Sequence, residues 1–260
     1  VNAGNSIASG GNYNTVVGDE AGTAISTGDN NVAVGYNALA TNSTASTNIA
    51  VGYQAAYSNA TGVGLTAFGA NTLYATTASD NCGIGTDNPG NYAAALESNT
   101  TGRFNTAVAT GALGSNTEGQ NNTALGHSAL AADTLGSRNT AIGVFSLDAQ
   151  NFSSATNSNN TALGYASGSA VTTGIDNTLL GSRSGMALTD ADYNTAVGYN
   201  ALTADTKGSK SIAVGTNALY AQNFTSATDS NNVAVGYSAG VAVTTGVNNT
   251  IIGGLAGDAL

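Results

Sequence analysis

The chain has 260 residues and a formal net charge of −10, with 15 acidic and 5 basic side chains, one proline, one cysteine and no tryptophan. Valine, leucine, isoleucine and phenylalanine account for 48 residues, below the roughly 20% that a conventional core usually needs. This argues against an enzyme with helices packed around a sheet, while the scarcity of charge and proline is untypical of disorder. The acidity argues against binding to nucleic acid or anionic membrane surfaces. Every apolar stretch is shorter than a membrane-spanning helix requires, so we expect no insertion into a membrane.

A five-residue motif of the type Asn-Thr-Ala-Val-Gly recurs along the whole chain. Fourteen copies begin at residues 14, 31, 48, 65, 81, 105, 122, 139, 160, 177, 194, 211, 232 and 249. Nine of the intervals between them are 17-residue steps, and the others are one 16-residue step, two 21-residue steps and one 24-residue step. A fixed period over an entire chain is typical of a solenoid. We therefore expect a single solenoid domain over residues 1–260, with an insertion region at 86–104.

A longer repeat lies on top of the short one. Residues 121–188 align without gaps to residues 193–260, with 39 of 68 positions identical, and each block contains one 21-residue step. Duplication of a four-coil unit explains this pattern, because each repeat of a solenoid contacts mainly its neighbours.

Each motif copy reads as a short β-strand. Counted from the motif asparagine, position three is alanine in ten of the fourteen copies, and position four is apolar in every copy. β-branched residues are enriched at positions two and four, which favours a strand with these two positions on one face and position three on the other. The prediction is an all-β parallel β-solenoid in which position three fills the interior. The apolar row at position four then needs a cover from outside the coil.

The glycine and asparagine of the motif have architectural explanations. A glycine at position five of nearly every coil indicates a corner with positive φ, or backbone packing too close for a Cβ. An asparagine at position one indicates a stacked amide ladder that satisfies turn backbone.

The pattern [N/S]-x-A-[V/I]-G-x-x-A resembles the head repeats of trimeric autotransporter adhesins, and it is also similar to arrays in phage tail-fibre proteins. The segment GIGTDNP at 83–89 is similar to segments near the distal region of such fibres. The resemblance implies a left-handed parallel β-roll, a homotrimer, and an extracellular location on a virion tail fibre or a bacterial cell surface. Adhesin heads have shorter coils than the 17-residue coil that dominates here, so we expect a different cross-section.

The sequence also argues for a homotrimer independently of that resemblance. A stacked row of aliphatic side chains at position four would expose far more than the few hundred Å² of apolar patch that a soluble monomer usually shows. Packing against two copies of itself around a three-fold axis buries the row. The expected interface residues are Val34, Val51, Leu125, Ile142, Leu163, Leu180, Val197, Val214, Val235 and Ile252.

Residues that could carry chemistry are few. His127 replaces one tyrosine of a row at position six, and no second histidine exists for a triad or a zinc site. Cys82 has no partner for a disulfide, and Asp190 with Asp192 forms only a minimal acidic pair that is a poor calcium site. We expect no catalytic residue, no metal and no cofactor.

Recognition is expected where the coils leave their period, because insertions protrude as loops. The two 21-residue steps carry Asn151-Phe152 and Asn223-Phe224, and an exposed aromatic ring can stack on a sugar or anchor a protein. The alternative is that both phenylalanines tuck over the coil edge or into the trimer. The insertion region adds Asn88 and Tyr92, with a tight turn expected at Asn88-Pro89-Gly90.

These observations favour a segment of a trimeric fibre or adhesin that spaces and presents binding to a host or another surface. Its candidate partners are a surface glycan or a protein receptor. The alternatives are an ice-binding or surface-binding β-solenoid and a structural filament subunit. Ice binding is the weaker of these, because position two mixes threonine with Val32, Ile49, Cys82, Ile212 and Val233.

Overall fold

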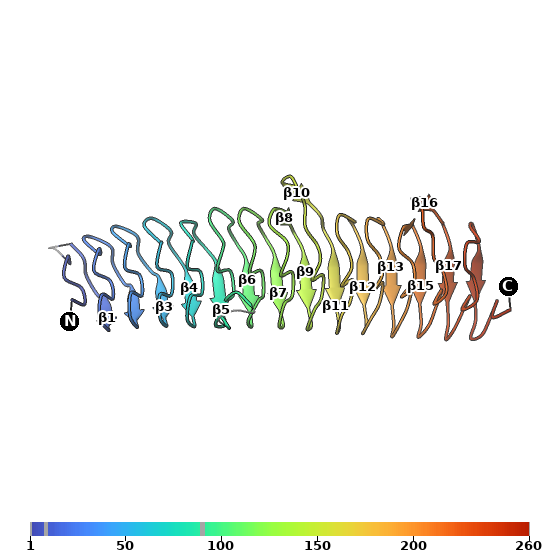
Figure 1. Cartoon of the computed structure of the whole chain (residues 1–260), viewed down its shortest axis with the longest axis horizontal. Helices are drawn as coiled ribbons and strands as arrows, with labels where there is room; N and C mark the ends of the chain where they lie inside the picture. Colours follow the sequence, from blue (N-terminus) through green and yellow to red (C-terminus); the bar gives the residue numbers. More distant parts are fainter. Residues whose placement is uncertain (1, 8–9, 89–91, 260) are drawn as a thin grey trace. The chain divides into compact units, whose positions relative to one another are not determined.

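The computed structural model describes residues 2–7, 10–88 and 92–259. Over these ranges the chain is an all-β parallel solenoid of about 14 turns without a helix, which confirms the predicted architecture. It divides into two compact units, Val1–Leu135 and Gly136–Leu260, and each unit contains a parallel ladder of seven strands (Figure 1). The single domain over 1–260 stays a prediction.

The strands of the main ladders are short and come once per turn. The first unit contains β1 (Thr15–Val17), β2 (Val32–Val34), β3 (Ile49–Val51), β4 (Thr66–Phe68), β5 (Cys82–Ile84), β6 (Thr106–Val108) and β7 (Thr123–Leu125). The ladder of the second unit contains β9 (Thr140–Ile142), β11 (Thr161–Leu163), β12 (Thr178–Leu180), β13 (Thr195–Val197), β15 (Ile212–Val214), β17 (Val233–Val235) and β18 (Thr250–Ile252).

The strand register follows the sequence repeat. Thr15 pairs with Val32, which holds the same motif position in the next coil, and equivalent motif positions pair within each ladder. The irregular steps keep the same register: Cys82 pairs with Thr66 across the 16-residue step and with Thr106 across the 24-residue step. Insertions and the deletion are therefore absorbed in the corners, and the strands stay aligned.

The alanine at position three points into the coil, as predicted. Ala33, Ala50, Ala124 and Ala196 are among the fully buried alanines of this position. Positions two and four of the same strands are exposed or half-buried, since successive side chains of a strand alternate between its faces.

Both predicted explanations apply to the glycine at position five: its φ is positive, and the backbone of the next coil lies too close for a Cβ. Gly35 has φ +130°, and a Cβ added to it would lie 2.4 Å from the carbonyl oxygen of Gly52 in the next coil. Gly198 is equivalent, with φ +131° and a Cβ position 2.6 Å from the carbonyl carbon of Gly215. Because the obstacle is backbone, it cannot move aside as a side chain could, and each strand ends at this corner.

The asparagine at position one forms the predicted ladder. The Asn31 Nδ2 donates to the carbonyl oxygen of Ala45 at 2.9 Å, near the end of the same coil. Its Oδ1 accepts the backbone N–H of Asn48 in the next coil at 3.0 Å. Asn31 and Asn48 are fully buried, so each amide closes one coil and links it to the next.

Position nine divides most coils into two kinds. In the 24-residue coil, positions after the insertion are counted without its seven extra residues. In a leucine coil, position nine is a buried leucine with positive φ and position twelve is a buried polar residue. In a glycine coil, position nine is glycine and position twelve is a buried aliphatic residue. The leucine coils contain Leu39, Leu73, Leu96, Leu113, Leu130, Leu147, Leu202 and Leu219, and the glycine coils contain Gly22, Gly168, Gly185 and Gly240. One coil has Ala56 at position nine, with the buried Asn59 at position twelve.

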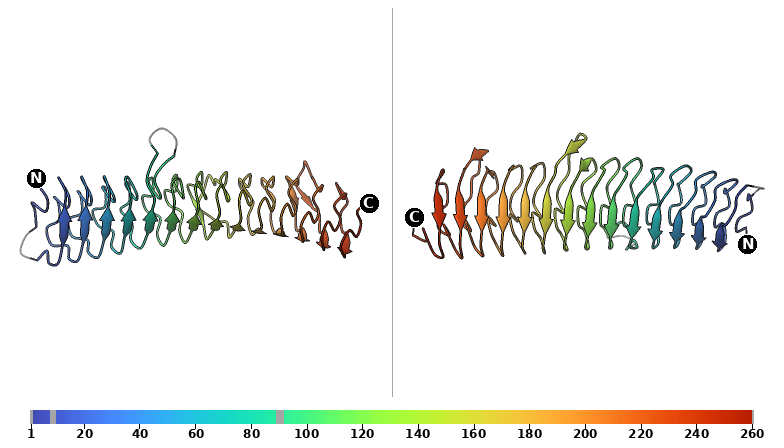
Figure 2. Two further views of the ribbon diagram at one scale, coloured as in Figure 1. Left: turned by 90° about the horizontal axis from the view of Figure 1, so that it is seen from below. Right: turned by 180° about the vertical axis from the view of Figure 1, so that it is seen from behind.

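The insertions leave the regular corners. In the second unit, β10 (Thr156–Asn157) pairs with β8 (Gly136–Ser137), and β16 (Thr228–Asp229) pairs with β14 (Gly208–Ser209), both in parallel. Figure 1 shows β10 and β16 displaced to the top of the view, away from the row of main strands. In the first unit, Figure 2 shows that the chain also leaves the regular coil between β5 and β6, within the 24-residue step.

Candidate binding surface

The outer strand face carries the residues predicted to form the trimer interface. Leu125, Leu163, Val235 and Ile252 are exposed, with exposed fractions from 37% to 70%. The other predicted members of the row are half-buried in the single chain: Val34, Val51, Ile142, Leu180, Val197 and Val214. Strand pairing stacks these side chains in register within each unit. The result is a continuous apolar row on the surface of each unit.

Position two forms a second row beside the first on the same face. In the second unit, Thr140, Thr161, Thr178 and Thr195 lie on four consecutive strands in direct register. Isoleucine takes this position in the next strand, where Ile212 is exposed. The outer face therefore combines a threonine-rich row with a fully apolar row, and neither contains a charged side chain.

The tyrosines at position six are exposed rather than buried. Tyr36 and Tyr53, on consecutive coils, stack with ring centroids 5.6 Å apart and an interplanar angle of 18°. Tyr165, Tyr199 and Tyr237 occupy the same position in the second unit and are also exposed. Stacking is therefore seen where two tyrosines of this row lie on consecutive coils.

The exposed aromatic rings predicted in the 21-residue coils are absent. Phe152 and Phe224 are each only 6% exposed, so the prediction that they project to solvent is wrong, and the alternative that they tuck over the coil is correct. Asn151 and Asn223 are exposed, and their backbone N–H groups donate to Thr172 and Thr244 of the next coil. The exposed tips are small residues: Ser153, Ser154, Ala155, Thr225, Ser226 and Ala227. Any role of these loops in binding stays a prediction.

A buried carboxylate explains why Phe224 turns inward. Asp205, fully buried in the preceding coil, accepts the backbone N–H groups of Gly208 at 3.0 Å and Phe224 at 3.1 Å through Oδ1. Its Oδ2 accepts Gln222 Nε2 at 2.6 Å. The sequence signal for this network is an acidic residue at position twelve directly before a Gln-Asn-Phe coil, and it occurs also at Asp133. The motif alone did not identify it, because aspartate is usually exposed.

The insertion in the 24-residue coil places Tyr92 against the one histidine of the chain. The rings of Tyr92 and His127 meet edge to face, with centroids 4.3 Å apart. Asn88 and Tyr92 exchange backbone hydrogen bonds of 3.0 and 3.3 Å and form an isolated bridge. Tyr92 is 40% exposed. The turn predicted at Pro89 and Gly90 lies outside the described residues.

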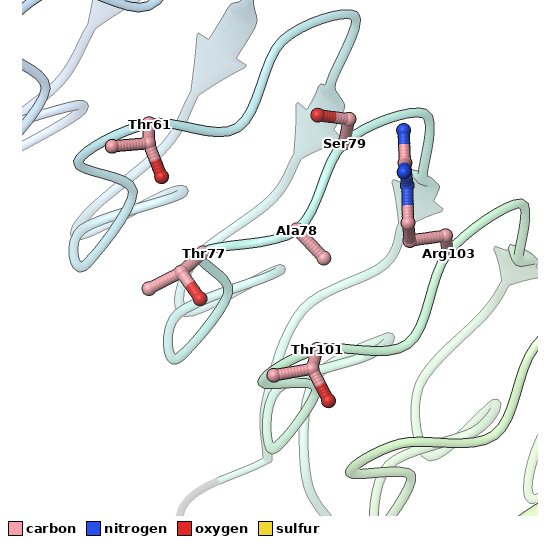
Figure 3. Close-up of a pocket in the computed structure, with 6 residues that line it drawn as sticks. All are labelled: Thr61, Thr77, Ala78, Ser79, Thr101 and Arg103. Atoms are coloured by element: carbon pink, nitrogen blue, oxygen red, sulfur yellow. The ribbon is translucent and has the colours of Figure 1, made fainter.

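A notch of about 280 Å³ opens in the first unit beside the 16-residue coil. It is lined by Thr61, Thr77, Ala78, Ser79, Thr101 and Arg103 (Figure 3). The Arg103 guanidinium forms an ion pair with Asp80 at 3.0 Å and lies 5.2 Å from the centroid of the Phe104 ring. No motif in the sequence indicates this feature, and its only signal is an irregular step.

Acidic side chains are spread along the coils. Asp190 lies 3.5 Å from Lys207 Nζ, and Asp192 accepts the backbone N–H of Ile175 at 2.8 Å. Burial raises the pKa of Asp192, although the hydrogen bond from Ile175 opposes this, and the nearby charges of Asp176 and Asp190 add to the rise. Among the described residues, no group of three histidine, cysteine, aspartate or glutamate side chains could hold a metal ion.

Cys82, at position two of β5, is a free thiol whose pKa burial raises. Within the described ranges, no helix is long and apolar enough to cross a membrane. Comparison with protein families, curated proteins and solved structures found no match to this chain.

Proposed function

We propose that this chain is a segment of a homotrimeric extracellular fibre or adhesin, in which it spaces and presents binding to a host or other surface. The observation that carries the proposal is the apolar row at position four, whose side chains are exposed or half-buried in the single chain. Three copies that meet through this row would remove it from water. The number three, the left-handed sense of the roll, and a place on a virion tail fibre or a bacterial surface follow the resemblance to adhesin heads.

The energetic argument is one of area. Each exposed aliphatic side chain contributes about 1.5–3 kcal/mol when it is fully buried. Leu125, Leu163 and Ile252 are each about half exposed or more, so each leaves a large part of that free energy unused in a single chain. Repeated once per coil and in three copies, these contributions oppose the loss of translational and rotational freedom on assembly, which costs about 4–15 kcal/mol for each association step.

The test is the mass of the particle in solution. We expect light scattering to give three times the 25.3 kDa of one chain, and Leu163→Asp or Val197→Asp to abolish assembly, because a carboxylate would be buried without a partner. Ser154→Asp, in an exposed loop of the same unit, is the matched control and should leave the mass unchanged. A stable wild-type particle at 25.3 kDa would contradict the proposal.

A cysteine substitution adds a geometric test. In the proposed trimer the row lies next to the three-fold axis, so each of its residues meets the same residue of the other copies. Leu163→Cys should therefore form an interchain disulfide on mild oxidation, whereas Ser154→Cys should not. Circular dichroism of each variant separates failure to assemble from failure to fold.

Presentation of a binding site has its own test. Each 21-residue coil can be replaced by a 17-residue coil without its four-residue insertion, and the insertion at 86–104 can be shortened in the same way. If these loops contact a receptor, binding of the trimer to cells or glycans should fall. Unchanged binding by a folded trimer would show that the loops are spacers.

The second candidate is an ice-binding or surface-binding solenoid, with a structural filament subunit as a further alternative. The observation that favours surface binding is the in-register row of Thr140, Thr161, Thr178 and Thr195 on a face without charge. This face is covered in the proposed trimer but free in a monomer. A monomeric particle with thermal hysteresis would therefore favour this candidate, and a trimer without it would favour the fibre.

A further inference from the structure

The notch beside the 16-residue coil results from the loss of one residue. In most coils, position fourteen carries an exposed side chain, such as Thr44, Thr61 or Thr101. The coil that begins at Leu65 passes directly from Thr77 at position thirteen to Ala78 at position fifteen. One rung is therefore missing between Thr61 and Thr101, and Figure 3 shows Thr61, Thr77 and Thr101 on three successive turns beside Ala78.

A matching substitution lets the shorter corner close. In the coils on either side, Asn59 and Asn99 at position twelve each donate to the carbonyl oxygen of the residue three places later, Gly62 or Gly102. In the 16-residue coil, the shorter Thr76 makes the equivalent contacts with Ala78, two places later, at 3.3 and 3.4 Å. The deletion is thus built into a satisfied corner, so the notch is a stable feature of the fold.

The lining of the notch consists mainly of hydroxyl groups. Thr77 Oγ1 donates to the carbonyl oxygen of Thr100 at 3.2 Å, and Ser79 Oγ accepts the backbone N–H of Val63 at 3.1 Å. A hydroxyl can donate one hydrogen bond and accept two, so both groups keep capacity for a ligand. Ala78 and the threonine methyl groups supply apolar surface between them.

Arg103 supplies the one charged group of the notch lining. Its guanidinium pairs with Asp80 and lies over the Phe104 ring, while the side chains of Arg103 and Asp80 stay 47% and 41% exposed and accessible to a ligand. Because Asp80 balances its charge and the chain carries a net charge of −10, a free anion gains little from this site. A neutral group that both donates and accepts hydrogen bonds fits the pair of charges better.

We propose that this notch binds one neutral sugar ring of a surface glycan. Its volume of about 280 Å³ is close to the roughly 300 Å³ at the lower end of small-molecule pockets, which suits a single ring. The inference deepens the proposed function and rests on it for the glycan's biological setting, but the notch lies within one chain and does not need the trimer. Three copies per particle would raise a weak intrinsic affinity by multivalent contact.

The experiment uses the full chain with the methyl glycosides of glucose, galactose, mannose and N-acetylglucosamine as probes. Saturation-transfer NMR and calorimetry should detect at least one of them at about millimolar affinity, since few hydrogen bonds are available in so open a site. Thr101→Val removes one lining hydroxyl and should weaken that binding about threefold to tenfold. Thr44→Val changes the same position of a 17-residue coil and should have no effect.

A filling variant makes the test independent of side-chain chemistry. Insertion of a threonine between Thr77 and Ala78, with Thr76→Asn, restores the 17-residue corner and should abolish binding while leaving the particle mass unchanged. Failure of all four glycosides to bind, or equal losses from Thr101→Val and Thr44→Val, would overturn the proposal. Displacement of a bound glycoside by an equal concentration of inorganic phosphate would also overturn it, in favour of an anion site. The trimer is tested by particle mass and the notch by glycoside binding. Either proposal can therefore fail while the other holds.

Discussion

Leucine coils and glycine coils fill the same cross-section in different ways. In the leucine coil of Leu113, the large side chain enters from position nine, and position twelve is the buried Asn116, whose Nδ2 donates to Asn99 Oδ1 of the preceding coil at 2.7 Å. In the glycine coil of Gly185, the aliphatic side chain of Leu188 enters from position twelve instead. The first interior is partly polar and hydrogen-bonded from coil to coil, and the second contains no polar side chain at either position.

The two arrangements also differ in backbone strain. Position nine has positive φ in both, +50° at Leu113 and +54° at Gly185. For a residue with a Cβ this conformation costs roughly 1–2 kcal/mol, whereas glycine adopts it freely. In a leucine coil, burial of the large side chain close to the strand offsets this strain. The comparison teaches that positions nine and twelve form one packing unit, and that neither residue can be interpreted alone.

Leu113→Ala should have the largest effect on this comparison. Leu113 is fully buried, so its truncation removes buried apolar surface and leaves a cavity while keeping the strained backbone. We expect a loss of about 2–5 kcal/mol in the free energy of unfolding, measured by chemical denaturation. Val63→Ala, at an exposed position of the same unit, should stay within about 0.5 kcal/mol of wild type. Equal losses of unfolding free energy from both variants would mean that the side chain at position nine does not stabilise the core.

Gly185→Leu forces the leucine arrangement into a glycine coil. A Cβ at this position would lie 2.7 Å from Leu179 Cδ2 and 2.8 Å from Leu188 Cδ1. We expect overpacking to lower the free energy of unfolding by about 1–3 kcal/mol. Because Leu202 holds a leucine at the same φ of +54° in another coil, the backbone itself permits the residue. A stabilised variant would show that the interior has unused space.

Conversion of a whole coil tests whether the two positions are coupled. Leu113→Gly and Asn116→Leu should each destabilise, the first by a cavity and the second by the loss of the hydrogen bond to Asn99 together with crowding. In the double variant, the leucine side chain introduced at position twelve takes over the space that Leu113 vacates. We expect its loss to be smaller than the sum of the single losses by about 1 kcal/mol. If the losses in the free energy of unfolding of the two single variants add up to the loss of the double variant, positions nine and twelve are not coupled.

The smallest expected effect concerns the corner of a glycine coil. Because burial raises the pKa of Asp192 in the folded state, its ionisation disfavours folding, and this penalty grows as the pH rises through the folded pKa. Asp192→Asn keeps an oxygen for the N–H of Ile175 and should be more stable than wild type at pH 7, by less than about 0.5 kcal/mol after solvent screening. The difference should vanish below the ordinary carboxyl pKa of about 3.9. Melting curves at pH 7 and pH 3 measure it, and a difference that is equal at both would contradict the assignment.

Much of the fold could be predicted from the repeat alone. The alternation of Ala33 with Val32 and Val34 fixes the inward and outward faces of a strand, and the glycine at position five marks where the strand must end. The sequence also shows that leucine at position nine occurs with a polar residue at position twelve, and glycine at position nine with an aliphatic residue. The reason for this pattern needs the structure. Positions nine and twelve are not neighbours on a strand, and only the structure shows that their side chains fill the same coil interior.

The irregular coils were harder to predict for a physical reason. Phe224 lies in a polar stretch, and its burial depends on Asp205, which lies in the preceding coil. The short ladders of β8 with β10 and of β14 with β16 likewise form between segments of different coils. Local composition cannot reveal such pairs. The apolar row was predictable as an uncovered face, but a sequence does not show which surface covers it, and the trimer stays a prediction.

The stacking of the coils has a mechanical consequence. Hydrogen bonds between consecutive coils, such as those from Gly35 to Val17 and from Gly52 to Val34, run along the stacking direction. Tension applied in that direction within a unit loads the successive steps in series, so every step bears the full force. Because each repeat is held mainly by its neighbours, the force at which a unit extends is set by its weakest step and not by the sum of its bonds. Adding coils would lengthen such a unit without making it stronger.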